Sequence, residues 1–120
     1  MIEKKDFFGK ELMYSVRDPS ISRFEDILNG KLKSKELIEL TNKLNDFNEP
    51  EREFIKKLVI TVVDNVIYNF LNMLEENEDT LTLLVNNEGG EKEDIVGLSD
   101  GLSGELFTND GWIGKFSHYR

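Results

Sequence analysis

The chain of 120 residues contains no cysteine, and its only histidine is His118. The first absence excludes a disulfide framework, a thiol nucleophile and a cysteine-ligated zinc. The second leaves little scope for imidazole-based catalysis or metal binding. Alanine and glutamine are absent too, whereas asparagine and lysine occur eleven times each. Because alanine is the strongest helix former, its absence indicates an AT-rich bacterial or phage genome better than a structural need.

Long apolar runs are also missing. The longest, 58–63, is interrupted by Thr61 and falls far short of the roughly 20 residues that a membrane helix needs. The N-terminus is charged and has no continuous apolar stretch typical of a secretory signal. With 38% hydrophobic and 32% charged residues, the composition is that of a globular protein. We therefore expect one cytoplasmic domain over residues 1–120, helical over 1–77, with short strands and turns over 78–120.

The first half of the chain is predicted to form helices with recognisable ends. Phe7 to Val16 suggests a short N-terminal helix, which Gly9 weakens. A second helix is expected to start at Asp18-Pro19 and to end at Asn29-Gly30. A third is expected to start at Ser34. The residues predicted to point inward from the last two are Ile21, Phe24, Ile27, Leu28, Leu37, Ile38, Leu40 and Leu44.

The segment 49–77 is the strongest structural signal, because Asn48, Pro50 and Glu51 together form a helix start with a capping box. At about 100° per residue, its apolar residues cover nearly half the circumference, in two sets. The first set is Ile55, Leu58, Val59, Val62, Val66, Phe70 and Met73. The second is Ile60, Val63, Ile67, Leu71 and Leu74. Such a wide apolar arc predicts a central helix covered on two sides, with Val62 and Val66 inaccessible to solvent.

After Asn77 the pattern changes. Residues 81–85 favour a strand, 86–94 a solvated loop or hairpin tip, and 109–111 a hairpin turn. A terminal helix from Gly111 is the alternative, because three aromatic residues follow at helical spacing. The predicted fold is therefore α+β and mostly α. N-terminal helices pack around one long central helix (about 49–77), followed by a small glycine-rich β and turn region.

Charge is concentrated just after the long helix. Residues 75–94 hold eight acids and one base, so they carry −8 + 1 = −7 of the net charge of −9. Such a surface attracts a basic partner and repels nucleic acid and anionic lipid. The candidate partner-binding residues are these acids and two aromatic residues that are typical of binding hot spots: Glu75, Glu76, Glu78, Asp79, Glu88, Glu91, Glu93, Asp94, Trp112 and Tyr119. The alternative for Trp112 is that it closes the core together with Phe116.

Patterns for catalysis or metal binding are weak. No register of the acidic loop 88–94 matches a calcium-binding EF-hand, and no phosphate-binding glycine loop is present. Gly97-Leu-Ser-Asp-Gly101 matches G-x-S-x-G, but this pattern indicates a serine nucleophile only in a large α/β sheet with a partner histidine. Asp100, Glu105 and Asp110 have no spacing that implies acid–base chemistry. We expect no cofactor, no metal and no catalytic residue.

Three functions remain as hypotheses. The first is a small acidic binding protein that occludes a basic protein partner, such as an immunity protein that blocks a nuclease-type toxin. The second is a non-catalytic subunit that self-associates through its long helix as a homodimer. The third, and weakest, is a small carboxylate- or serine-based hydrolase that uses Ser99 and His118. Neither nucleic acid nor membrane is an expected partner.

Overall fold

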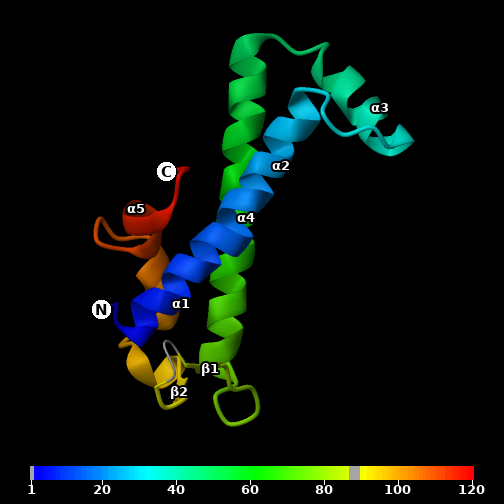
Figure 1. Cartoon of the computed structure of the whole chain (residues 1–120). Helices are drawn as coiled ribbons and strands as arrows, with labels where there is room; N and C mark the ends of the chain where they lie inside the picture. The colour runs from blue at the N-terminus through cyan, green and yellow to red at the C-terminus, as the bar shows by residue number, and fades with distance from the viewer. Residues whose placement is uncertain (1, 87–89) are drawn as a thin grey trace.

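The computed structural model describes residues 2–86 and 90–120 and confirms the mostly helical α+β fold. Helix α4 (Glu49–Glu76) runs the length of the molecule, and an N-terminal helical stretch crosses it (Figure 1). The small strands lie at the C-terminal end of α4, and the short C-terminal helices run back along it as far as α5 (Trp112–Phe116), which lies beside its middle (Figure 1). The molecule measures 51 × 30 × 28 Å. Helix α4 packs against α2 (Asp18–Leu28) and against segments before and after it in the chain, while one of its sides keeps exposed apolar residues.

The N-terminal stretch is one continuous helix and not the two that the sequence predicts. Helix α1 (Lys4–Leu12) passes into a π-helical turn, η1 (Met13–Arg17), and then into α2 (Asp18–Leu28). The predicted start at Asp18-Pro19 is therefore wrong, since Arg17 before it is already helical, and the Asp18 carboxylate accepts from Ser117 and His118. A proline inside a helix leaves a carbonyl without its donor, and here the wider π turn lies directly before it. The helix continues through Pro19.

The end of α2 matches the prediction. Gly30 has a positive φ of 70°, and the amides of Gly30 and Lys31 bond back to the carbonyls of Ile27 and Asp26. This is the hydrogen-bond pattern of a Schellman motif, in which glycine is favoured. The next helix, α3 (Lys35–Leu44), begins at Ser34, whose hydroxyl accepts from an amide one turn on. Both predicted helix boundaries are confirmed.

Helix α3 projects from the molecule beside the start of α4 (Figure 1). It packs mainly against α2, and Thr41 is its only buried residue. Of the residues predicted to point inward, Leu37 and Leu44 are half-buried, whereas Ile38 and Leu40 are exposed. The prediction for the last two is wrong, because only one neighbouring helix covers α3.

Helix α4 starts as predicted, with Asn48 and Glu51 exchanging both bonds of a capping box. Beyond α4, β1 (Leu84–Val85) pairs antiparallel with β2 (Glu93–Asp94). The strand predicted over 81–85 is thus shorter than expected. The tip predicted over 86–94 is also too long, because its last two residues form β2 and only 86–92 connect the pair. Residues 87–89 of that tip lie outside the described part of the chain.

The remainder forms short helices and no further strand among the described residues. These are the 3₁₀ helices η3 (Val96–Leu98) and η4 (Leu102–Leu106), followed by α5 (Trp112–Phe116). The hairpin turn predicted over 109–111 is therefore wrong, and the alternative of a terminal helix is right. Glycine lowers helix stability through its backbone freedom, but Trp112 packs tightly enough into the core to hold α5 in place.

The core forms where α1, the second half of α4 and these short helices meet. Trp112 is 1% exposed, contacts the edge of Phe8, and its indole N–H donates to Asp6. A Cβ on Gly9 would lie 2.3 Å from the Trp112 ring, so this helix position requires glycine. The buried core residues are Leu12, Met13, Ile67, Leu71, Leu74, Val85, Ile95, Leu102, Leu106 and Trp112.

Candidate functional site

One side of α4 is apolar and exposed to solvent. Six large apolar residues at helical spacing there are exposed, and we call them the outer face: Phe54, Leu58, Val62, Val66, Phe70 and Met73. Val62 and Val66 are 60% and 61% exposed. The prediction that they would be inaccessible is wrong, and so is the spine covered on two sides that it assumed.

The physical reason lies in the two apolar sets on α4. The rest of the chain packs on the second set, so that Ile67 is 3% exposed and Leu71 and Leu74 are buried with it. Five members of the first set stay exposed in the described structure, whereas Ile55 and Val59 at its edge are half-buried. Helical periodicity shows that a face is apolar, but it does not show which apolar face the rest of the chain covers.

The outer face also lacks charge. Between Lys57 and Glu75 the sequence has a single charged residue, Asp64. Asp64 does not serve the outer face, because its carboxylate binds Arg17. Over 58–73 the face therefore extends about 22 Å at 1.5 Å per residue without a charge to repel an apolar surface.

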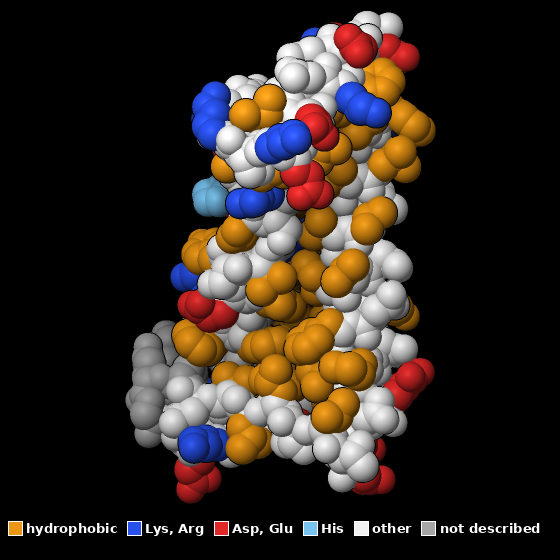
Figure 2. All heavy atoms as spheres, turned by 90° about the vertical axis from the view of Figure 1, so that its right-hand side faces the viewer, with side chains coloured by type: hydrophobic (Ala, Val, Ile, Leu, Met, Phe, Trp, Pro, Cys, Tyr) orange, Lys and Arg blue, Asp and Glu red, His pale blue; other side chains and the backbone are white. Residues whose placement is uncertain are grey.

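Hydrophobic side chains run down the side of the molecule from which α3 projects, and they are densest in its lower half (Figure 2). Further exposed apolar residues belong to the segments flanking α4, Phe47 before it and Leu81 and Leu84 after it. Soluble monomers rarely expose a contiguous apolar patch of more than a few hundred Å², and larger ones mark binding surfaces.

The predicted acidic site is divided by the fold. Glu75 accepts from the amide of Ser103, and Asp94 accepts from the amide of Val96. Glu76 accepts from Asn72, and Glu93 forms an ion pair with Lys4 at 2.6 Å. Among the described residues, Glu78, Asp79 and Glu91 are exposed and make no ion pair. Glu88 lies outside the described residues. Of the described acids in this segment only Glu93 has its charge offset by an ion pair, whereas the hydrogen bonds of the others hold the side chains in place and leave their charge.

The two aromatic candidates lie apart from these acids. Trp112 is in the core, as its alternative predicted, so its ring is not available at the surface. Tyr119 is half-buried, and its hydroxyl donates to Glu25 at 2.6 Å. This hydrogen bond lowers the pKa of Glu25 and raises the pKa of Tyr119. Tyr119 thereby holds the C-terminal segment against α2.

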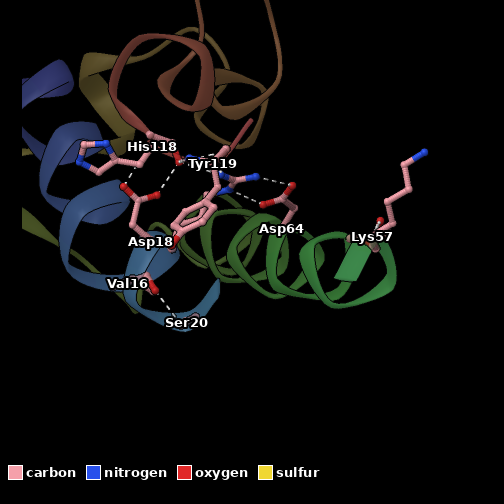
Figure 3. A network of polar contacts seen from close by, with 10 residues as sticks. Val16, Asp18, Ser20, Lys57, Asp64, His118 and Tyr119 are labelled. Atoms are coloured by element: carbon pink, nitrogen blue, oxygen red, sulfur yellow. Dashed lines mark hydrogen bonds and ion pairs between the residues drawn. The ribbon is translucent and has the colours of Figure 1, made fainter. Parts of the chain in front are cut away.

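Sequence reasoning missed a polar network around Arg17, which is 1% exposed. Its guanidinium binds both carboxylate oxygens of Asp64, at 2.6 and 3.2 Å, and donates to the hydroxyl of Ser117 at 2.7 Å and to the carbonyl of Tyr119. Asp18 accepts from Ser117 and from the amide of His118. Residues of α2, α4 and the C-terminal segment thus converge (Figure 3).

No sequence signal singles out Arg17, because its partners lie 47 to 102 residues away. The network's polar atoms all have partners, as do all buried side-chain nitrogens and oxygens in the described chain. Bidentate pairing of this kind positions chain segments. We interpret it as a structural clamp on the C-terminal segment.

The G-x-S-x-G match does not form a nucleophile site. Ser99 lies between two 3₁₀ helices, and its hydroxyl donates to Glu105 at 2.6 Å. Glu105 in turn forms an ion pair with Lys5, so Ser99 lies near position 5 of the N-terminal helical stretch. His118 stacks on Tyr14, which is nine residues after Lys5 in the same stretch. At 1.5 Å per residue these positions are roughly 14 Å apart, so Ser99 and His118 are not partners.

The described structure offers no support for a small-molecule site beside His118, for a metal site or for a membrane span. The hollow beside His118, lined by Tyr14, Asp18, Pro19, Ser22 and Tyr119, is open, and the carboxylate of Asp18 is already hydrogen-bonded. Within residues 2–86 and 90–120, no group of His, Asp and Glu side chains is arranged to hold a metal ion. No described helix has the length and apolar character to cross a membrane.

Comparison with known proteins adds no function. No protein-family model, no curated protein and no solved structure matches this chain. The outer face of α4 is therefore the candidate site on the strength of its own geometry.

Proposed function

We propose that this chain is a non-catalytic binding subunit that acts through the outer face of α4. The observation that carries this proposal is the exposure of Val62 and Val66 in the middle of a helix whose opposite side is the core. Exposing such a row of apolar residues to water costs free energy, and burying it against a partner is favourable. A surface that served only solubility would carry charge here.

Site-specific photocrosslinking in the native host tests the proposal. A photoreactive amino acid at Val66 should give discrete crosslinked adducts, because the partner covers this position. The same amino acid at Thr61 is the matched control, since Thr61 is exposed on the polar side of α4. Equal adduct yields at the two positions, or none at Val66, would refute the outer face as a binding surface.

A basic protein partner, as for an immunity protein that blocks a nuclease-type toxin, is the second candidate. Its support is the group of exposed acids without ion pairs in the described chain, Glu78, Asp79 and Glu91. Long-range attraction by such charges acts mainly on the association rate. The residues proposed from the sequence as contacts are narrowed to these three, because the side chains of Glu75, Glu76, Glu93 and Asp94 are held by bonds within the chain.

Stopped-flow binding to the product of the adjacent gene tests this second candidate. Replacing the three acids by glutamine or asparagine should slow association at low salt and have little effect at high salt, where the Debye length falls toward about 3 Å. Glu75→Gln is the control, since that carboxylate is bound within the chain. An association rate that changes neither with salt concentration nor with the triple substitution would exclude electrostatic steering.

A further inference from the structure

We propose that the occupant of the outer face of α4 is a second copy of this chain, packed antiparallel to the first with a twofold axis near Val66. This inference rests on the proposed function, since it names the partner of the same surface. It assigns a homodimer in which each outer face covers the other.

The outer face is complementary to itself in this orientation. A twofold interface brings the same patch of both copies together. With the axis near Val66, Val62 lies opposite Phe70 of the second copy, because both are four residues from Val66. Leu58 likewise lies opposite Met73 of the second copy, within one residue. Val66 meets its own copy at the axis, and each of the two flanking pairs sets a smaller or branched side chain against a longer one, as interdigitated packing requires.

The exposed area is close to that of a dimer interface. The six residues of the outer face are 38% to 61% exposed. With side-chain areas on the order of 150–200 Å², they present about 500 Å² per copy. With the axis near Val66, Phe54 lies opposite position 78, beyond the end of α4, so the other five residues of two copies would bury about 800 Å², and a specific interface needs about 1,000 Å². The apolar residues that flank the face add to this area.

Charge selects the antiparallel orientation. By sequence, residues 75–94 at the end of α4 carry −7, whereas residues 29–57 around its start hold seven bases and six acids, or 7 − 6 = +1. A parallel pair would bring two segments of −7 together, and an antiparallel pair places each beside the weakly positive end of the other copy. Like charges held close repel, and unlike charges attract. An unrelated basic partner would find no acid within the outer face itself.

Sedimentation velocity of the full chain tests the dimer, over roughly 1 to 200 µM to include a weak interface. The wild-type chain should shift from monomer to dimer as its concentration rises. Val66→Asp should be monomeric throughout, with the circular dichroism of the wild type, because position 66 is exposed in the monomer. Thr61→Asp, with the same added charge on the polar side, should dimerise as the wild type does. A monomeric wild type, or equal loss in both variants, would overturn the proposal.

Single-cysteine variants test the antiparallel orientation of the two copies. Unlike Val66→Asp, they introduce no charge that could disturb the fold. The chain has no cysteine of its own, so Val66→Cys should form a disulfide with itself on mild oxidation. Leu58→Cys should not, because at 1.5 Å per residue the two copies of position 58 would be about 24 Å apart. A mixture of Leu58→Cys and Met73→Cys should crosslink as a mixed pair. Efficient crosslinking of Leu58→Cys with itself would exclude the antiparallel arrangement.

The photocrosslinking experiment separates the two levels of inference. An adduct at Val66 with the mass of two chains supports both the binding surface and the second copy. An adduct with a different protein, beside a monomeric wild type in sedimentation, keeps the surface as a binding site and overturns the second copy. The absence of any adduct refutes the surface itself.

Discussion

Replacing Arg17 by methionine should destabilise the protein by about 3–5 kcal/mol, the usual cost of removing one partner of a buried ion pair. Arg17 is buried, and Asp64 is largely covered. The substitution fills much of the same volume but leaves the Asp64 carboxylate without its cation. The hydroxyl of Ser117 and the carbonyl of Tyr119 each lose the hydrogen bond from Arg17 at the same time, although each keeps a second donor within the C-terminal segment. This is a large share of a total stability of roughly 5–15 kcal/mol.

Urea unfolding at a fixed protein concentration measures the effect. With a slope of about 1.5 kcal/mol per molar for a small domain, the expected loss lowers the unfolding midpoint by 2 M or more. Arg52→Met is the matched control, because Arg52 makes an exposed ion pair with Glu49 on the same helix as Asp64. Exposed pairs contribute about 1 kcal/mol or less, so the control should unfold close to the wild type.

The double variant Arg17→Met, Asp64→Leu distinguishes a missing charge partner from a packing defect. Replacing both partners of a buried pair by apolar residues is often close to neutral. We expect the double variant to recover at least half of the stability lost in Arg17→Met. If Arg17→Met unfolds within 1 kcal/mol of the wild type, or if the double variant is no better than the single one, the clamp does not stabilise the fold.

Two further predictions concern other contacts. Gly9→Ala should destabilise the chain by about 1–3 kcal/mol despite alanine's higher helix propensity, because its Cβ would overlap the Trp112 ring; Gly104→Ala, which has open space around it, should stay near the wild-type stability in thermal melts. The stability that Tyr119→Phe loses should depend on pH. The hydrogen bond lowers the pKa of Glu25 and raises that of Tyr119. The loss of stability should therefore be greatest between about pH 5 and 9. It should shrink below about pH 4, where Glu25 is protonated, and above about pH 10, where Tyr119 ionises. A difference from the wild type that stays constant from pH 3 to 11 would contradict this.

Local sequence determined the helix boundaries that depend on neighbouring residues. The capping box at Asn48, the cap at Ser34 and the left-handed exit at Gly30 all involve partners within six residues. Such signals can be read without knowing the rest of the fold. These local signals failed only at Asp18-Pro19. The two residue types there are typical of a helix start, but the Asp18 carboxylate bonds to residues near the C-terminus and caps no helix.

The tertiary structure alone decided which apolar face of α4 is covered. Val66 and Ile67 are adjacent and chemically similar, yet one is 61% and the other 3% exposed. Their difference comes from α1, the short C-terminal helices and Trp112, which pack on one side of α4 only. The buried role of Arg17 has the same origin, since its partners meet only after the C-terminal segment folds back onto α2 and α4. Periodicity is a property of one helix, whereas burial is a property of the helix together with everything that packs against it.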